Sequence, residues 1–319
     1  MENLLQGLRA AGEETRLRLL VLCGHSELTV SELTQILGQS QPRVSRHLKL
    51  LCEAGLLDRF QEGSWVYYRL SSKNNSSLLA RTLVDLVPET DFTVSRDLER
   101  LETVKQARVM AAEEYFRENA ARWREIRSLH VPEKEVERVL LSIFKGQVIT
   151  DFLDIGTGTG RMLELFGPRV THAIGVDTSR EMLSFARAEI EEAGLRNCQV
   201  RLADMYNLPF AGGSQDAIVI HQVLHYAEAP EKVIAEAARV LRPGGQMAIV
   251  DFARHDVDSL MREHAHRQAG FDKATVAEYC EQAGLAAMDC QVLAGDPLTV
   301  NIWTAAAGAD VKSKGAANA

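Results

Sequence analysis

The chain has 319 residues, of which 25% are charged and 46% apolar, and its formal net charge at pH 7 is −8. This composition is typical of a globular protein, and the length accommodates two domains and a connector. No apolar run approaches the roughly 20 residues that span a bilayer, and residues 1–16 lack a basic segment followed by an apolar one. We therefore expect a cytoplasmic protein without a secretory signal.

The chain divides by pattern into four segments. Residues 1–73 predict short helices closed by a β-hairpin, and residues 74–147 predict a helical linker with a dimerisation helix and an entry helix to a pocket. Residues 148–305 alternate apolar strands with helical patterns, which indicates an α/β domain with a parallel sheet. The small, polar residues 306–319 predict a disordered tail.

The first segment contains the pattern of two helices joined by a turn. Residues 29–32, with the sequence TVSE, predict a capping box, and the helix that it opens ends at Gly38. A second helix follows Ser40 and buries one stripe at helical spacing. The stripe consists of Val44, Leu48 and Leu51.

The outer face of the second helix is a candidate DNA-binding surface. Residues 41–49 hold three cationic side chains and a histidine but no acid, which suits a recognition helix in the major groove. The hairpin over residues 55–70 can serve as a wing, although a winged helix that makes only protein contacts is the alternative. The candidate DNA-binding residues are Gln41, Arg43, Ser45, Arg46, His47, Lys49 and Arg59.

Residues 4–72 resemble the winged helix-turn-helix of ArsR-type bacterial repressors, through SQPRVSRHLKLLCEAGLL and GSWVYYRL. The resemblance implies transcription regulation by a homodimer, built from the first helix and a helix at about residues 76–87, on a palindromic double-stranded DNA operator. Many such repressors sense metals through cysteines before the turn, where this chain has LTQIL, or through the helix after the wing, which here contains no His or Cys. We therefore expect no metal, and a signal that comes from the rest of the chain.

A strand and a glycine-rich loop open the α/β domain with the sequence DFLDIGTGTGRMLEL at residues 151–165. A dinucleotide fingerprint counted from Gly156 needs a glycine where Arg161 stands, and no P-loop lysine follows. Both phosphate-binding classes are thus excluded by spacing. Asp154, which precedes the glycines, suits a cationic ligand such as the ammonium group of an amino acid.

Further polar residues end the next strands at the same edge of the predicted sheet. Asp177 ends HAIGVDTS, where an acid can hold both hydroxyls of a ribose. Asp204 ends CQVRLADM and can accept from an adenine amino group, and His221 ends the fourth strand. An ammonium, a ribose and an adenine without a phosphate describe S-adenosylmethionine.

About residues 110–305 resemble the class I S-adenosylmethionine-dependent methyltransferases, most of all the ubiquinone/menaquinone-biosynthesis group. Four motifs match in order: LDIGTGTGRMLEL, GVDTSREMLSFAR, LADMYNLPFAGGSQDAIVIHQVLHY and ARVLRPGGQMAIVDF. The resemblance implies a Rossmann-like seven-stranded sheet with S-adenosylmethionine as cofactor and S-adenosylhomocysteine as product or effector. An α/β domain with a vestigial pocket is the alternative.

The resemblance also implies a role for individual residues around the cofactor. The methionine end is lined by Asp154, Gly156, Gly158 and Gly160. The ribose and base are held by Asp177, Thr178 and Met182, and the adenine is surrounded by Ala203, Asp204 and Met205. His221 and Gln222 line the bottom of the pocket near the sulfonium. Tyr115 contacts the pocket from the entry helix; the alternative is that this segment is an ordinary amphipathic helix.

Methyl transfer requires in-line positioning and often a base, for which His221, His225 and Tyr226 are candidates. Two functions stay open. The domain methylates a small-molecule acceptor while the DNA-binding segment regulates the corresponding operon, or it is a non-catalytic S-adenosylmethionine and S-adenosylhomocysteine sensor that represses methionine-cycle genes. Arsenite methylation is disfavoured, because the five cysteines are scattered without a CxxC pair and no thiolate cluster is visible.

Overall fold

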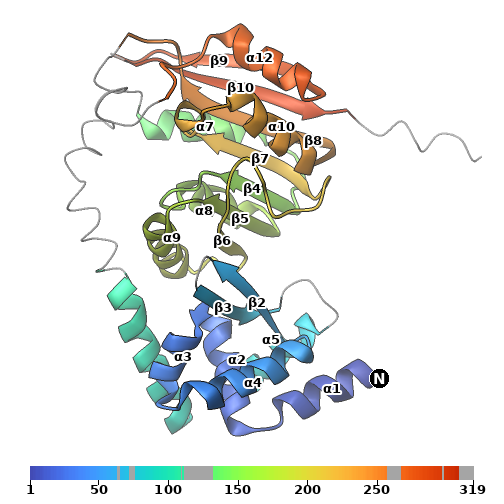
Figure 1. Cartoon of the computed structure of the whole chain (residues 1–319), viewed down its shortest axis with the longest axis vertical. Helices are drawn as coiled ribbons and strands as arrows, with labels where there is room; N and C mark the ends of the chain where they lie inside the picture. The colour runs from blue at the N-terminus through green and yellow to red at the C-terminus, as the bar shows by residue number, and fades with distance from the viewer. Residues whose placement is uncertain are drawn as a thin grey trace, which may run out of the picture. The chain divides into compact units, whose positions relative to one another are not determined.

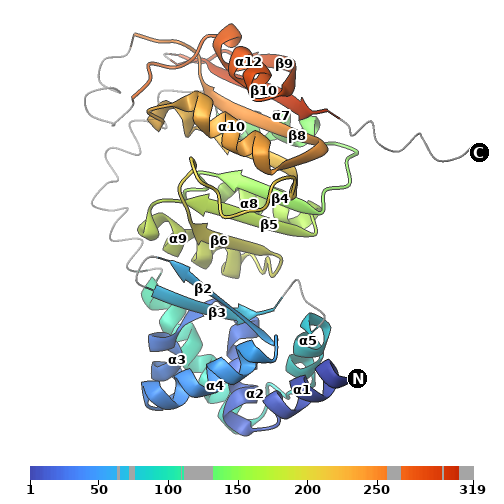
Figure 2. The same ribbon diagram turned by 45° about the vertical axis from the view of Figure 1, so that its right-hand side comes forward.

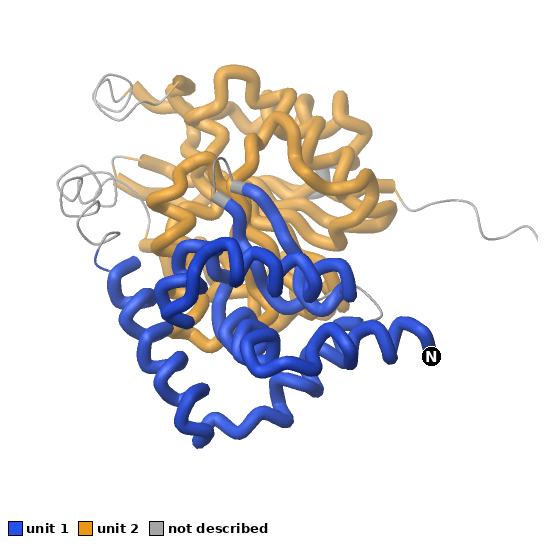
Figure 3. The backbone as a smooth tube through the Cα atoms, turned by 60° about the horizontal axis from the view of Figure 1, so that its bottom comes forward, with its two compact units in different colours: residues 1–111 blue, residues 112–319 orange. Residues whose placement is uncertain are grey.

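The computed structural model describes residues 1–62, 65–71, 76–108, 110, 132–256, 267–296 and 298–308. The chain forms two compact units, residues 1–111 and residues 112–319 (Figure 3). Every helix in the described ranges is too short or too polar to cross a bilayer.

The first unit is a bundle of helices with a small antiparallel sheet (Figure 1). Its helices are α1 (Glu2–Ala11), α2 (Glu14–His25), α3 (Val30–Leu37), α4 (Gln41–Glu53) and α5 (Ser77–Leu86), and residues 92–108 are also helical. Its strands β1 (Leu28–Thr29), β2 (Leu57–Glu62) and β3 (Trp65–Leu70) lie in the order β1-β3-β2. The predicted helix-turn-helix and hairpin are therefore confirmed.

Local sequence signals set the ends of α3 and the buried face of α4. Thr29 accepts from the Glu32 backbone N–H and Glu32 accepts from that of Thr29, so the predicted capping box is present. Gly38 ends α3 in the left-handed conformation, with φ of 64°. The stripe that α4 buries is fully inaccessible and consists of Val44, Leu48 and Leu51.

The second unit contains a seven-stranded sheet in the order β6-β5-β4-β7-β8-β10-β9. The strands are β4 (Asp151–Ile155), β5 (His172–Asp177), β6 (Cys198–Leu202), β7 (Gln215–His221), β8 (Leu241–Phe252), β9 (Leu285–Leu293) and β10 (Val300–Ala307). Neighbours among β4 to β8 are parallel, whereas β10 is antiparallel to both β8 and β9. This mixed sheet agrees with the predicted Rossmann-like, seven-stranded class.

Helices cover both faces of this sheet (Figure 2). They are α7 (Glu133–Ile143), α8 (Arg161–Phe166), α9 (Arg180–Glu192), α10 (Pro230–Val240) and α12 (Lys273–Gln282), with short 3-10 turns η1 (Gly167–Arg169) and η2 (Leu224–Tyr226). The first three pack on one face around Phe152 and its neighbours. The helices α10 and α12 pack on the other face, around Leu153. Alternate residues of β4 thus serve two separate cores.

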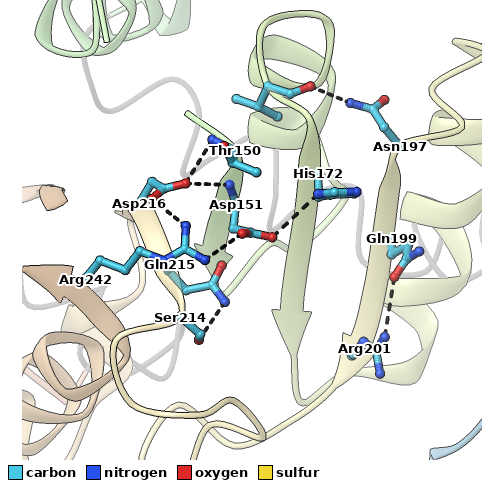
Figure 4. A network of polar contacts seen from close by, with 11 residues as sticks. Thr150, Asp151, His172, Asn197, Gln199, Arg201, Ser214, Gln215, Asp216 and Arg242 are labelled. Atoms are coloured by element: carbon cyan, nitrogen blue, oxygen red, sulfur yellow. Dashed lines mark hydrogen bonds and ion pairs between the residues drawn. The ribbon is translucent and has the colours of Figure 1, made fainter. Parts of the chain in front are cut away.

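A polar network joins the amino ends of the central strands (Figure 4). Asp216 accepts from the backbone N–H groups of Thr150 and Asp151, each at 2.9 Å. The Arg242 guanidinium donates to both Asp216 and Asp151, and His172 Nδ1 lies 3.6 Å from an Asp151 oxygen. Partial burial raises the pKa of Asp216, but the backbone N–H of Asp151 and the Arg242 guanidinium outweigh it and leave that pKa lowered. This network lies at the amino ends of the strands. The polar residues that the sequence motifs place around a ligand lie at the carboxyl ends.

Candidate functional site

The candidate DNA-binding residues lie mostly on exposed parts of α4 and β2. Gln41, Arg43, Arg46, Lys49 and Arg59 are exposed, while Ser45 and His47 are half-buried. The two residues at the tip of the predicted wing, 63 and 64, lie outside the described residues. The exposed set presents cations and an amide to solvent without an intervening acid over residues 41–49, as a groove-reading helix requires.

His47 differs from the other candidates on α4. Its Nδ1 lies 3.6 Å from Glu13 Oε2, and only 14% of its side chain is exposed. Glu13 also caps α2 by accepting from the Arg16 backbone N–H. The imidazole thus joins α4 to the start of α2, so a packing role competes with its predicted role in DNA binding.

The three glycines after β4 all adopt positive φ: 73° at Gly156, 53° at Gly158 and 86° at Gly160. A Cβ on Gly156 would lie 2.1 Å from Val223 Cγ2, whereas a Cβ on Gly158 would meet nothing within 4 Å. All three positions therefore favour glycine because of their left-handed conformation. Gly156 has a second reason, since only a residue without Cβ can lie so close to the segment after β7. The open side at Gly158 is where a ligand can approach the backbone.

Asp154 is buried beside this loop, with a relative exposure of 1%. Neither of its carboxylate oxygens has a hydrogen-bond partner among the described residues, and the buried Thr157 hydroxyl also lacks one. Burial raises the pKa of Asp154 to about 7; the nearby Thr157 hydroxyl lowers that pKa by less, and the charge of Asp177 raises it further. A buried carboxylate without a partner is destabilising by itself and indicates a place for a cationic, hydrogen-donating group.

Asp177 ends β5, as predicted, and both of its oxygens face the backbone of the loop and of α9. It accepts from the N–H groups of Gly158 and Ser179, each at 2.9 Å. Each carboxylate oxygen has a second lone pair, so the group can also accept from hydroxyls of a ligand. Of its predicted partners, Thr178 is exposed, and Met182 is buried on the first turn of α9.

The predicted adenine-side residues follow β6. The Ala203 N–H donates to the Asp177 backbone carbonyl at 3.0 Å, which ties this segment to the end of β5. Asp204 is exposed and accepts from the Tyr206 N–H at 3.0 Å, while Met205 is half-buried. Tyr206, which sequence reasoning missed, accepts through its Oη from the N–H groups of residues 228 and 229 and so anchors the segment to the start of α10.

His221 and Gln222 lie at the end of β7. Gln222 has φ of 54° and is the one non-glycine residue with positive φ in the described part of the chain. Its N–H donates to the Val250 carbonyl at 2.7 Å, which holds the turn against β8. Such backbone strain occurs preferentially at ligand sites, where it fixes the direction of the neighbouring side chains.

The structure separates the three candidate bases. His221 is half-buried, and Tyr226 is 38% exposed. His225 is 2% exposed, and its Nδ1 lies 2.8 Å from Asp251 Oδ1. The same carboxylate accepts from the His225 backbone N–H at 3.2 Å and is itself inaccessible. Sequence reasoning missed Asp251, whose only signal was its place near the end of the fifth predicted strand.

Tyr115 lies outside the described residues. Cys280 of α12 and Cys290 of β9 line one cavity of about 310 Å³ together with Trp303. The fold of β9 back along α12 brings them there. The described residues contain no group of three or more His, Cys, Asp or Glu placed to hold a metal ion.

Comparison with known proteins identifies two families in one chain. Residues 13–59 match the family described as bacterial regulatory protein, arsR family, and residues 153–249 match the family described as methyltransferase domain. Two segments of the chain are thus similar to an arsR-family regulator and to a methyltransferase domain, as the sequence motifs predicted.

The curated relatives that match the chain include two named methyltransferases. A phosphatidylethanolamine N-methyltransferase of Cereibacter sphaeroides is 40% identical over 104 residues, which cover 32% of this chain and 51% of the relative. A demethylmenaquinone methyltransferase of Listeria welshimeri is 33% identical over 133 residues, covering 40% of this chain and 55% of the relative. The chain therefore spans about half the length of these curated relatives.

Solved structures show the same fold for this part of the chain. The YcgJ protein of Bacillus subtilis superimposes with a TM-score of 0.50 at 18% identity, over 55% of this chain and 99% of the other. A putative methyltransferase of Haloferax volcanii, in complex with the Trm112 methyltransferase activator, superimposes with a TM-score of 0.52 at 20% identity, over 62% and 98%. At these identities the likeness establishes the fold alone.

Proposed function

We propose that the protein is a DNA-binding transcription regulator whose second unit binds S-adenosylmethionine and S-adenosylhomocysteine. The observation that carries this proposal is the buried, unpartnered carboxylate of Asp154 beside three left-handed glycines. An ammonium group supplies both the charge and the N–H donors that the two Asp154 oxygens lack. The residues present therefore fit the amino-acid end of the cofactor.

The remaining polar groups fit the rest of the same ligand. Asp177 would hold the ribose hydroxyls while it keeps the loop in place through Gly158. Asp204, which is exposed, would accept from the adenine amino group, and Met182 would pack on the base. Bound here, the cofactor supplies an electrophilic methyl group. The chain's own part is to orient it and to exclude water.

Identification of the ligand in the purified protein tests this proposal directly. The protein is denatured and the released small molecules are analysed by mass spectrometry, and binding is then measured by calorimetry with S-adenosylmethionine and S-adenosylhomocysteine. We expect one adenosyl ligand per chain. A protein that binds neither compound contradicts the proposal.

Methylation of a small molecule is the first candidate for the step after ligand binding. Tyr226, which is 38% exposed, is then the most accessible of the candidate bases. The second candidate is a non-catalytic sensor of methionine-cycle genes, and the burial of His225 favours it, because a general base must reach its acceptor. Operator affinity measured with and without each ligand distinguishes them, since a ligand that binds both states equally shifts nothing.

Exposed leucines support a homodimer of the first unit. Leu4, Leu5 and Leu8 on α1 are 43–46% exposed, and Leu78 and Leu86 on α5 are 75% and 71% exposed. A second copy would bury these side chains and place two recognition helices on a palindromic operator. Light scattering of the protein and of a variant with Leu78→Glu tests this arrangement, and a monomeric parent contradicts it.

A further inference from the structure

Asp154 lies on β4, between β5 and β7 in the sheet, in surroundings that disfavour its charge. Its register neighbours are Gly175 on β5 and Val219 on β7, neither of which offers a side-chain donor. Its own side chain has 1% relative exposure and both oxygens lack a partner. Taking a carboxylate out of water without such compensation strongly disfavours its charged form.

The charged and titratable groups on the surrounding elements do not offset that cost. Asp177 at the end of β5 acts on Asp154 through its charge, and the Thr157 hydroxyl lowers the pKa of Asp154 by less than burial raises it. The other titratable groups on the adjoining elements include Arg161 and Glu164 of α8 and His221 of β7. Arg161 is already engaged, because it donates to Glu164 and to Glu137 of α7 at 2.6 and 2.7 Å. Asp177 carries the same charge as an ionised Asp154 and therefore opposes its ionisation.

We propose that binding of the ligand's cationic group at this site is coupled to the loss of a proton from Asp154. The inference rests on the proposed function, because the cation is the ammonium group of the adenosyl ligand. In the free protein near pH 6 the carboxyl group is neutral and keeps its O–H. When the ammonium binds, the O–H proton passes to the buffer, and the carboxylate accepts N–H bonds from the cation. No covalent bond of the ligand changes.

The coupling makes affinity depend on pH in a defined direction. Below the pKa of Asp154, about 7, each binding event must first remove a proton, so affinity falls as the pH falls. The dissociation constant is expected to rise about fivefold from pH 7 to pH 6 and a further roughly tenfold from pH 6 to pH 5. The ligand's own amino group, with an ordinary pKa near 8 or above, stays charged over this range.

Calorimetry of the full chain with S-adenosylhomocysteine tests the inference. Titrations at pH 6 in two buffers of different ionisation enthalpy, phosphate and imidazole, give the number of protons released per ligand. We expect about 0.9 proton released at pH 6. Binding with no proton release at pH 6 overturns the coupling but leaves the proposed cofactor in place, whereas the absence of binding at pH 6 and pH 7.5 contradicts the proposed function itself.

Two variants assign the proton to Asp154. Asp154→Asn has no proton to lose, so its binding is weaker at pH 7.5 and shows the same heat in both buffers. Glu278→Gln changes an exposed carboxylate of α12 and is expected to release the wild-type number of protons. Proton release retained in Asp154→Asn overturns the assignment. Should that variant fail to fold, the buffer dependence of the wild-type protein still decides whether binding and proton release are coupled.

Discussion

Asp177 and Gly158 are joined by a hydrogen bond of 2.9 Å from the glycine N–H to the carboxylate. The predicted ribose anchor and the predicted methionine-end loop are thus one rigid unit. The second oxygen of Asp177 accepts from Ser179, which begins α9. One side chain therefore holds the loop, the strand end and the helix start in fixed relation, and this relation is preorganisation of the kind that ligand sites require.

Replacing Asp177 by Ala is expected to weaken S-adenosylhomocysteine binding by about 10- to 100-fold, because hydrogen bonds to a charged acceptor contribute roughly 1.5–3 kcal/mol. Asp177→Asn keeps the shape and one acceptor oxygen and should fall between wild type and Ala. Calorimetry at pH 7.5 gives the three constants. Equal affinity in wild type and Asp177→Ala would show that the ribose is held elsewhere.

Gly156→Ala is expected to abolish detectable cofactor binding. It should also lower the free energy of unfolding by more than the cost of placing a non-glycine residue at positive φ. The new Cβ would lie 2.1 Å from Val223, in addition to the cost of φ at 73°. Gly146→Ala is the matched control, since Gly146 has φ of 83° but nothing within 4 Å of the added Cβ. That control isolates the backbone cost, which is about 1–2 kcal/mol.

The double variant Gly156→Ala with Val223→Ala separates the clash from the strain. Removing the valine methyl groups should recover much of the Gly156→Ala loss, as measured by thermal unfolding and ligand binding, but not all of it, because the remaining Cβ of residue 223 would still lie 3.0 Å from the new Cβ. A Gly156→Ala variant that unfolds like Gly146→Ala would mean that the segment after β7 is not held against the loop.

Asp154→Asn is expected to stabilise the free protein at neutral pH while it weakens binding. Between the ordinary value of 3.8 and the raised pKa of about 7, the native state keeps a proton that the unfolded chain has lost, so stability falls as pH rises. The slope is at most about 1.4 kcal/mol per pH unit. The variant lacks this pH-dependent contribution to the free energy of unfolding. Its stability relative to wild type should therefore increase from pH 4 to pH 7 and then stay constant.

Chemical denaturation of both proteins at several pH values measures that difference, in which contributions of other groups cancel. A difference that does not change between pH 4 and pH 7 would contradict the assignment. Cofactor sites commonly trade stability for function, and a site residue whose removal stabilises the free protein is the expected sign of that trade.

Arg46→Ala is expected to weaken binding to the DNA upstream of the gene by about 1–3 kcal/mol if the guanidinium contacts a base. If the guanidinium contacts a phosphate, the salt slope, which is the slope of log affinity against log salt concentration, is expected to fall in magnitude by about 1. His47→Ala should leave the salt slope unchanged, because His47 faces Glu13. Arg138→Ala, an exposed cation of the second unit, is the control. An unaltered gel shift for Arg46→Ala would refute the assignment of α4 as the recognition helix.

Sequence patterns predicted those features that depend on neighbours in the chain. The capping box at Thr29 and Glu32 requires residues three apart, and the positions of Asp177 and His221 follow from where an apolar strand stops. Ordered motifs then gave the sheet class, because the alternation of strands and helices restricts topology. These local signals sufficed for the arrangement of the carboxyl ends of β4, β5 and β7.

Contacts between distant segments could not be predicted in this way. His225 and Asp251 are 26 residues apart, and their pairing depends on the parallel register of β7 with β8. Cys280 and Cys290 share a cavity only because β9 turns back along α12. The contact of His47 with Glu13 likewise depends on how two helices cross, which no spacing in the sequence records.

The buried His225–Asp251 pair is expected to stabilise the second unit. Asp251→Ala removes the acceptor of the His225 ring, of the His225 N–H and of the Phe252 N–H, all of them buried. Breaking a buried pair from one side costs about 3–5 kcal/mol, since the partner groups stay unsatisfied. Asp272→Ala, which removes an exposed contact with Arg254, should cost less than about 1 kcal/mol. Thermal unfolding of the second unit compares the two. If Asp251→Ala unfolds like Asp272→Ala, the pair is not what holds η2 to β8, and His225 becomes a stronger candidate for the base that takes a proton from an acceptor.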